Sequence, residues 1–141
     1  MAITSGQQLV YGSTAARRIL DVDSKKPCAV RVFSNSIWIH LQGQRPTFIS
    51  KRKFKQHFID WRKQKAQSLT VVQWAVEPHY FSVSNPAKGS IYQVECSAQA
   101  LACGCEDYKN QMKFFGRGCC KHGYAVLAQL GFGSLSEYLT A

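Results

Sequence analysis

The spacing of hydrophobic and polar residues predicts a short helix and a β-hairpin near the start of the chain. Residues 1–14 contain glycine, serine and threonine and are expected to be loop-like, whereas residues 15–20 can form a short helix. Residues 29–33 and 37–41 are rich in β-forming side chains and flank a Ser-Asn-Ser turn, so they predict an antiparallel hairpin. A glycine and a proline then interrupt the pattern.

A longer amphipathic helix is predicted over residues 51–66, which contain neither glycine nor proline and follow Ser50, a good N-cap residue. Phe54, Phe58 and Trp61 recur at i, i+4 and i+7, which puts them on one face of a helix. We expect this apolar stripe to dock on the hairpin.

The second half of the chain has three strand-like runs and a final helix. The runs cover residues 69–76, 80–84 and 91–96 and are separated by proline-containing segments. The helix begins near residue 121 and is ended by Gly131. Strands mixed with a few helices, without βαβ alternation, predict an α+β fold of mixed antiparallel strands.

Composition is typical of a globular domain. Of the 141 residues, 45% are hydrophobic and 18% are charged. The longest apolar run is far shorter than the ~18 residues that a membrane helix needs. The first twenty residues lack the apolar block of a secretory signal. We therefore expect a cytoplasmic protein, or a nuclear one in a eukaryote, with reduced thiols and no membrane partner.

The basic excess of the chain is concentrated in its first half. Residues 1–70 contain thirteen Lys and Arg but three Asp and Glu, whereas residues 71–141 contain five of each kind. This asymmetry favours a polyanion-binding region joined to an electrically neutral one. The plain alternative is that the excess charge serves only solubility.

Two cysteine pairs have the spacing of metal ligands. Cys103 and Cys105 form a C-x-C pair, and after fourteen residues Cys120 and His122 form a C-x-H pair. Two such pairs suit a closed tetrahedral zinc site. In an extended segment residues i and i+2 face the same side, so the first pair can reach one ion. Residues two apart on a helix do not share a face, so Cys120 should precede the last helix, with His122 in its first turn.

This pattern resembles the SWIM-type zinc finger, whose C-x-C and C-x-H pairs are separated by a variable gap. The resemblance covers residues 92–131. It extends to a leading strand at 92–94, an acidic-aromatic pair at 107–108 and a helix that contains 125–127. Two positions depart from the family. Glu106 stands where the family commonly has proline, and Cys119 doubles the third cysteine, which leaves open whether Cys119 replaces Cys120.

The resemblance suggests a division into a basic α+β region, residues 1–88, and a SWIM-type zinc finger region, residues 89–141, packed together as one compact unit. It implies a finger that ends in a helix and that serves DNA binding, or protein contacts in remodelling, recombination and transposition. Three thiolates and a neutral imidazole around Zn²⁺ leave one net negative charge. We therefore expect the zinc to be structural and not to attract phosphate.

Two other chemistries could use these cysteines. An even number suits a disulfide framework, but a reducing compartment and the paired spacing disfavour it. A Cys–His nucleophilic pair needs an accessible thiolate, whereas four metal ligands leave no open coordination position. Cys28 and Cys96 are interpreted as small buried hydrophobes, and the histidines at 40, 57 and 79 as structural or surface residues.

The helix predicted over residues 51–66 carries seven basic residues against one acidic residue. At about 100° per residue, four of them fall within an arc of about 100° beside the aromatic stripe. These four are Arg52, Lys55, Arg62 and Lys63. A phosphate backbone would neutralise their mutual repulsion. A solvated surface helix is the alternative; a membrane-surface helix is disfavoured because the stripe is needed for the core.

These observations predict a zinc-stabilised nucleic-acid-binding protein that makes mainly phosphate contacts, with DNA favoured over RNA. In the finger, the candidate contacts are Lys113, Arg117 and Lys121, and the adjacent Phe114 and Phe115 are interpreted as packing residues. The alternative is a protein–protein adaptor that docks a helicase, recombinase or transposase through the finger. The chain has no P-loop, paired-carboxylate motif or nuclease signature, so we expect no enzyme activity.

Overall fold

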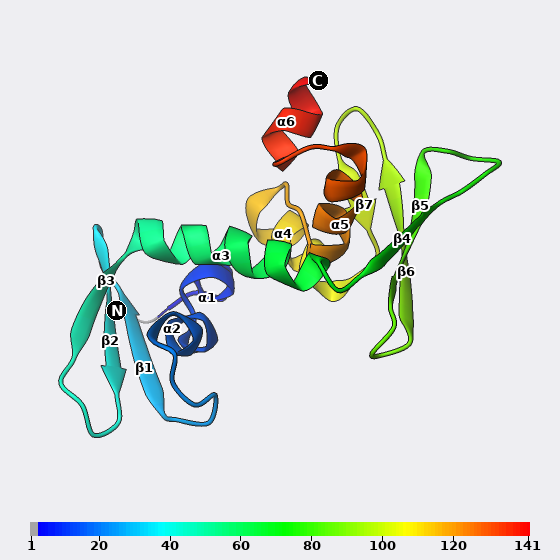
Figure 1. Ribbon diagram of the computed structural model, residues 1–141. Coiled ribbons are helices and arrows are strands. Elements are labelled where there is room, and N and C mark those ends of the chain that lie inside the picture. The colour runs from blue at the N-terminus through cyan, green and yellow to red at the C-terminus, as the bar shows by residue number, and fades with distance from the viewer. Residues whose placement is uncertain (1–2) are drawn as a thin grey trace. The chain divides into compact units, whose positions relative to one another are not determined.

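The computed structural model describes residues 3–141, which form helices and two antiparallel sheets, one of three strands and one of four (Figure 1). The α+β fold predicted from the sequence is therefore confirmed. The chain divides into two compact units between Asp60 and Trp61. No helix in the described part of the chain is both long and apolar enough to cross a membrane.

The position of this division differs from the sequence-based expectation, which put it between residues 88 and 89. In the structure, residue 88 lies in the turn of a hairpin between β5 (Tyr80–Asn85) and β6 (Ser90–Cys96), inside the second unit. The two strands are paired along their lengths, and a boundary there would break a continuous ladder of backbone hydrogen bonds.

The first unit is a three-stranded sheet with two short helices before it and the start of a long helix after it. Neighbouring strands are antiparallel in the order β1-β2-β3. The elements are α1 (Ser5–Tyr11), α2 (Ser13–Leu20), β1 (Cys28–Val32), β2 (Ser36–Leu41), β3 (Thr47–Ser50) and α3 (Lys51–Ala66). Because α3 continues past residue 60, its last residues belong to the second unit.

The predicted hairpin is confirmed as β1 and β2, and it supplies much of the core of the first unit. In β2, Ile37 and Ile39 are buried while Ser36, Trp38 and His40 are partly exposed, as a period of two requires. Phe54 of α3 joins this core with no exposed surface, and its ring meets that of Tyr11 edge-on at a centroid distance of 5.8 Å. The predicted docking of the aromatic stripe is confirmed for Phe54, whereas Trp61 belongs to the second unit.

Two elements of the first unit were not predicted. The segment expected to be a loop contains α1, which begins with a capping box in which Thr4 and Gln7 each accept the other's backbone N–H. The strand β3 pairs with β2 and contributes Ile49 to the core. A strand of four residues is too short to show a hydrophobic period, so its pairing is decided by the tertiary context.

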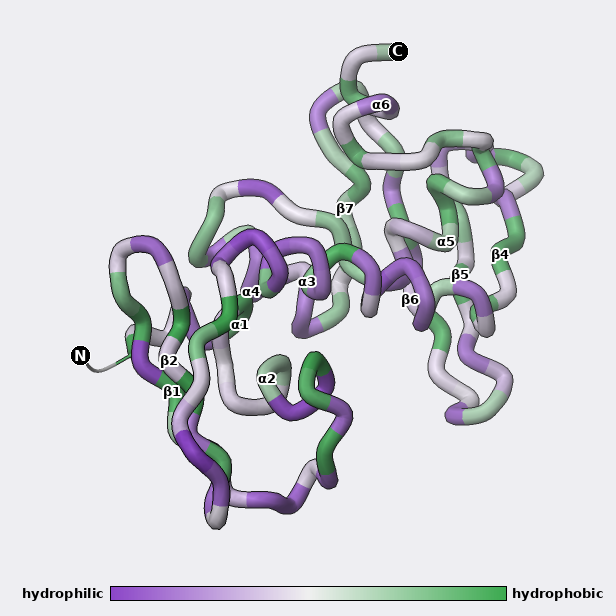
Figure 2. The backbone as a smooth tube through the Cα atoms, turned by 60° about the vertical axis from the view of Figure 1, so that its left-hand side comes forward, coloured by the Kyte–Doolittle hydropathy of each residue, from purple (hydrophilic) through white to green (hydrophobic). Residues whose placement is uncertain are grey.

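The second unit packs helices on a four-stranded sheet of order β4-β5-β6-β7. Phe81, Val83 and Val94 of the sheet are buried in one cluster with Val126 and Leu127 of α5. Besides β5 and β6, the elements are β4 (Thr70–Gln73), β7 (Leu101–Cys103), α4 (Glu106–Phe115), α5 (Lys121–Leu130) and α6 (Leu135–Thr140). Figure 2 shows that α3 has long hydrophilic stretches.

The predicted strands of the second half are confirmed as β4, β5 and β6, and α5 has the predicted bounds. Gly131 ends α5 in the left-handed conformation, with φ of 88°. The strand β7 and the helices α4 and α6 were not predicted. In α4 the N-cap is Cys105, whose sulfur accepts the N–H of Tyr108 at 3.4 Å. Cysteine is not among the usual N-cap residues, so the sequence carries no ordinary start signal for this helix.

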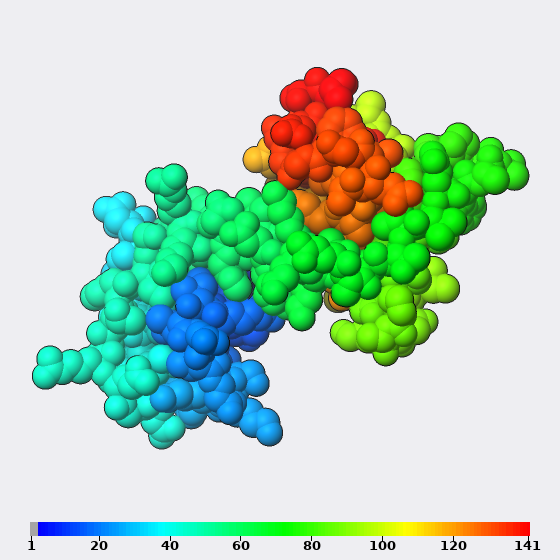
Figure 3. All heavy atoms as spheres, in the orientation of Figure 1, coloured from blue at the N-terminus to red at the C-terminus, as the bar shows by residue number. Residues whose placement is uncertain are grey.

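The edge of the four-stranded sheet at β4 leaves hydrophobic side chains exposed. Val72 of β4 is 57% exposed, and Val76, in the connection from β4 to β5, is 92% exposed. The connection between β4 and β5 projects from the sheet of its unit, as the green segment in Figures 1 and 3 shows. Exposed apolar residues at an unpaired sheet edge are a feature that monomeric proteins usually avoid.

The packing of Phe54 leads to a first prediction. Replacing Phe54 by Ala should destabilise the first unit by about 3–5 kcal/mol, because it removes a fully buried aromatic side chain and leaves a cavity. The matched control is Phe48→Ala, whose side chain is 61% exposed and which should cost less than about 0.5 kcal/mol. Denaturant unfolding measures both, and equal midpoints for the two variants would contradict the core assignment.

Candidate metal centre

Four metal-ligating side chains converge in the second unit. Cys103 ends β7, Cys105 caps α4, Cys120 caps α5, and His122 lies in the first turn of α5. Their ligand atoms all lie within 4.8 Å of one another, and all four residues are buried. The structure therefore brings together the four ligands predicted from the sequence, with the last two at the predicted start of the helix.

The separations fit a tetrahedral site with three sulfurs and one nitrogen. Nδ1 of His122 lies 3.6 Å from Sγ of Cys103 and 3.7 Å from Sγ of Cys120. Bonds of about 2.3 Å to sulfur and about 2.1 Å to nitrogen would put tetrahedral ligands about 3.6–3.8 Å apart. A buried group with these donors and distances is able to hold a metal ion.

The electrostatics of the cluster favour a cation. The pKa of Cys105 is lowered because the thiols of Cys103 and Cys120 and the N–H of Tyr108 donate hydrogen bonds to its sulfur. The pKa of Cys103 is raised to about 11, chiefly by its hydrogen bond to Cys105, and that of Cys120 is also raised, chiefly by its hydrogen bond to Cys103. Three buried thiolates repel one another, and a divalent cation at their centre would offset that repulsion.

A chain of polar contacts links α3 to the backbone beside Cys120. The guanidinium of Arg62 donates to both carboxylate oxygens of Asp107, at 2.9 and 2.8 Å. The amide of Gln111 donates to Asp107 and to the carbonyl of Cys119, each at 3.1 Å, and accepts the N–H of Cys119 at 3.0 Å. These contacts fix the segment that enters α5, and thus the positions of its two ligands relative to α4.

We call the two hydrogen bonds between the Gln111 amide and the Cys119 backbone the Gln111 clamp. Glycine at position 118 allows this clamp to form. A Cβ at Gly118 would lie 2.5 Å from Cβ and from Oε1 of Gln111, closer than real Cβ contacts. The short side chain therefore lets the backbone before Cys119 approach the amide that binds it.

Cys119 is separated from the ligand set. Its sulfur donates to the carbonyl of Cys120 at 3.7 Å, and it lies against Gly123, where a Cβ would approach it to 2.9 Å. Burial raises the pKa of Cys119 to about 12, so the thiol stays protonated. Of the two adjacent cysteines, Cys120 therefore supplies the ligand atom of the cluster. All six cysteines are free thiols in the structure, and Cys28 and Cys96 are half-buried.

The structure gives Arg62 a different role from the phosphate contact expected from the sequence. Arg62 is 7% exposed and is held in an ion pair by Asp107. On the helix it lies about 40° from Phe58, at the edge of the basic arc nearest the aromatic stripe. This position turns its guanidinium inward, so Arg62 pairs with Asp107 beside the Cys/His cluster and does not face solvent as a phosphate contact would.

The other predicted contact residues are solvent-accessible. Arg52 and Lys55 are exposed on the part of α3 in the first unit, and Lys63 is exposed on the part in the second. In the finger, Lys113 and Arg117 are exposed and Lys121 is half-buried. Nζ of Lys113 lies 5.3 Å from the ring centroid of Phe114, whereas Phe115 is 44% exposed and is not a core residue.

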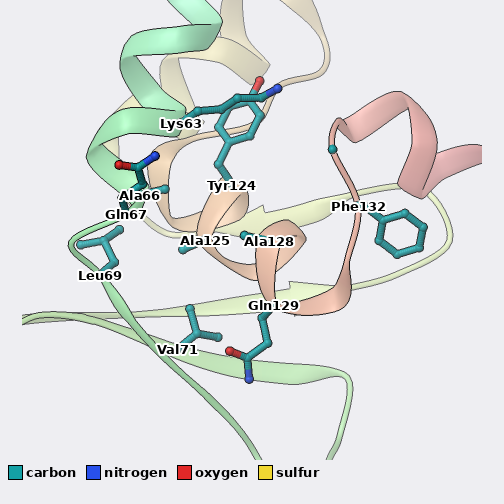
Figure 4. A pocket seen from close by; sticks show the side chains of 11 residues that line it. Lys63, Ala66, Gln67, Leu69, Val71, Tyr124, Ala125, Ala128, Gln129 and Phe132 are labelled. Atoms are coloured by element: carbon teal, nitrogen blue, oxygen red, sulfur yellow. The ribbon is translucent and has the colours of Figure 1, made fainter.

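Two hollows of similar size flank the helix α5. One has a volume of about 480 Å³. Figure 4 shows that apolar side chains line it together with Gln67 and Gln129, and that Lys63 extends across the ring of Tyr124. The distance from Nζ of Lys63 to that ring centroid is 5.9 Å. The other, of about 470 Å³, adjoins the metal-ligand cluster itself and includes Cys105 and His122 in its wall.

Sequence reasoning identified the four ligands but missed the residue that clamps them. Gln111 is buried at 2% exposure, yet nothing in its local sequence distinguishes it from a surface glutamine. The one available signal was the i, i+4 spacing of Asp107 and Gln111, which puts both on one face of a helix. That signal required α4 to be recognised as a helix.

The ligand assignment leads to a second prediction. Replacement of Cys103, Cys105, Cys120 or His122 by Ala, one at a time, should abolish binding of one metal equivalent and lower the melting temperature of the second unit. Cys119→Ala is the matched control and should retain the metal, because its sulfur lies outside the cluster. Elemental analysis of the purified variants gives the stoichiometry. Retention of a full equivalent by any ligand variant would argue against this site.

The clamp leads to a third prediction. Gln111→Leu should lower metal affinity by about 10- to 100-fold, because a leucine can neither donate to nor accept from the backbone of Cys119. Gln129→Leu makes the same chemical change at an exposed position of α5 and should leave affinity unaltered. Competition with a chelator measures both. Equal metal affinities of the Gln111→Leu and Gln129→Leu variants would show that the clamp does not affect the ligands.

Comparison with known proteins identifies no relative. No family model matches the chain, and no curated protein or solved structure is significantly similar to it. The resemblance to the SWIM-type zinc finger therefore rests on the ligand spacing and its neighbouring residues alone.

Proposed function

We propose that the metal held by this cluster is Zn²⁺ and that its role is structural. Three thiolates and an imidazole suit zinc, which prefers four tetrahedral ligands of this softness. With all four positions filled by protein atoms, no position remains for a reactive water. The proposed zinc site therefore stabilises the second unit, and we propose no catalytic activity for the chain.

We propose further that the chain binds nucleic acid, mainly through phosphate contacts from its basic first unit. The observation that carries this proposal is the distribution of charge: residues 1–60 contain ten Lys and Arg against three Asp and Glu. Arg52, Lys53 and Lys55 are exposed on α3 and form no ion pair within the described residues. Accessible, unneutralised cations on one helix suit a phosphate backbone.

The SWIM-type pattern supports DNA as the partner in preference to RNA, since that family is associated with DNA processing. Contacts with phosphates orient a protein on a duplex and carry little sequence information. We therefore propose binding of limited sequence specificity, to which Lys113, Arg117 and Lys121 of the second unit add contacts.

An adaptor that docks a DNA-processing enzyme is the second candidate function. The exposed hydrophobic residues of β4 and of the connection that follows it, Val72 and Val76 above all, favour it, because such patches mark protein interfaces. In this case the basic first unit would only steer the encounter with the complex.

The proposed phosphate contacts lead to a fourth prediction. The triple variant Arg52→Glu, Lys55→Glu and Lys63→Glu should weaken duplex binding steeply. The slope of log Kobs against log[salt] should shrink by about 0.9 for each phosphate that the protein no longer neutralises. Fluorescence anisotropy with a labelled DNA duplex at several salt concentrations measures both quantities. Arg62 is left unchanged, because a glutamate there would face Asp107 and disturb the metal-binding cluster.

The control for this experiment carries the same change in charge elsewhere. Lys25, Arg45 and Lys109 are exposed and lie outside α3, so their replacement by Glu alters net charge equally without touching the basic helix. Duplex binding should weaken far less in this control than in the α3 variant. Weak binding that responds neither to salt nor to the α3 substitutions would favour the adaptor.

A further inference from the structure

The hollow of about 470 Å³ beside the metal-ligand cluster has the composition of a binding site. It lies between the end of α3, the turn from β5 to β6, and the starts of α4 and α5. Its volume is within the range of about 300–1,000 Å³ typical of ligand sites. Aromatic and cationic side chains dominate its wall, and it adjoins a ligand cluster whose atoms are held in place.

Two aromatic rings line this hollow. Trp61 and Tyr92 are both half-buried, so each has surface inside the unit and surface open to solvent. Tyr92 packs against His122 with the two rings tilted, their centroids 4.6 Å apart and their planes at 39°. The ring of Trp61 attracts cations, since the charged ends of Arg62 and Lys65 lie 5.7 and 5.6 Å from its centroid. Oriented, accessible rings of this kind are platforms for flat π-systems.

Two lysines supply positive charge to the same wall. Lys88 is exposed, Lys121 is half-buried, and neither takes part in an ion pair within residues 3–141. Asp107 is the carboxylate of the wall, and its charge is already matched by the two contacts from Arg62. The zinc-filled cluster beside the hollow would carry one net negative charge, so the two lysines leave the wall with a net positive charge for an anion that approaches the aromatic rings.

From these contacts we propose that the hollow binds a nucleotide of single-stranded nucleic acid. Its base would stack on Trp61 or Tyr92, and the adjoining phosphates would contact Lys88 and Lys121. The inference rests on the proposed nucleic-acid binding and deepens it, because it names the strand state that the second unit selects. A paired base in a duplex stays stacked on its neighbours, whereas an unpaired base can enter a hollow and stack on aromatic side chains.

The proposal separates two contributions to binding. Stacking depends on the rings and is insensitive to salt, whereas phosphate contacts depend on the lysines and release counterions. Trp61→Leu should therefore weaken single-strand binding without altering its salt slope. The double variant Lys88→Gln, Lys121→Gln should flatten the slope by about 1.4, at about 0.7 for each phosphate contact on a single strand.

The experiment titrates the metal-loaded full-length protein with a labelled oligothymidylate of about 12 nucleotides and with a DNA duplex of the same length. Trp61→Leu should lower single-strand affinity by about 5- to 100-fold and leave duplex affinity unchanged. Trp61→Phe should restore most of the affinity because it keeps an aromatic face. Trp74→Leu is the matched control, since that tryptophan is outside the hollow.

Metal content and melting temperature are measured for every variant, so that a folding defect is not taken for a stacking defect. If Trp61→Leu loses metal, Tyr92→Leu tests the second ring in its place, with Tyr92→Phe as its conservative partner. The proposed single-strand site would be wrong if the ring and lysine variants bound single strands with unaltered affinity and salt slope. Weakened binding in the α3 variant would then still support the proposed function. Failure of both oligonucleotides to bind the wild-type protein would overturn both.

Discussion

Three thiols and one imidazole share a buried space in which no two ligand atoms are more than 4.8 Å apart, and the second unit is organised around this crowding. Sulfurs this close cannot all carry negative charge without a cation. Hydrogen bonds among the thiols lower the pKa of Cys105 and raise the pKa values of Cys103 and Cys120. The ends of β7, α4 and α5 meet at this point, so the cluster joins a strand to two helices. A metal ion there would tie the three elements together.

The cluster is supported by a polar chain from α3, through Asp107 and Gln111, to the backbone of Cys119. The Arg62–Asp107 ion pair is partly buried, since the Asp107 side chain is 31% exposed, and the cost of removing its charges from water offsets much of their attraction. Its effect here is geometric. The carboxylate of Asp107 orients the amide of Gln111. That amide binds both the N–H and the carbonyl of Cys119, and this fixes the backbone so that the side chain of Cys120 points toward the other ligands.

The two units differ in their balance of basic and acidic residues. Residues 1–60 carry ten basic and three acidic side chains, whereas residues 61–141 carry eight and five. In the second unit one arginine is paired and buried, and lysines lie over aromatic rings at distances below 6 Å. The first unit has such contacts too, with Arg31 over Trp38 and Lys51 over Tyr11. Arg52, Lys53 and Lys55 differ from these, because they are exposed and form no ion pair within residues 3–141.

The sequence by itself determined the features that depend on local periodicity and spacing. The hairpin of β1 and β2, the helices α3 and α5 with their full bounds, and the four ligand residues were all predicted, because each is encoded within a few adjacent residues. The strands β3 and β7 were not predicted, since runs of four and three residues carry no readable period. Hydrogen bonds to the neighbouring strands stabilise β3 and β7, although their own sequences do not indicate a strand.

Tertiary structure alone decided which polar residues turn inward. Arg62 lies beside Lys63 in the sequence, yet it is buried against a carboxylate 45 positions away while its neighbour is exposed. Gln111 and Asp107 acquire their roles only because α4 brings them to the backbone before Cys120. The choice between two adjacent cysteines was settled in the same way, by contact with Gly123 and the carbonyl of Cys120. Contacts between residues distant in the chain depend on the folded arrangement, and no local pattern records them.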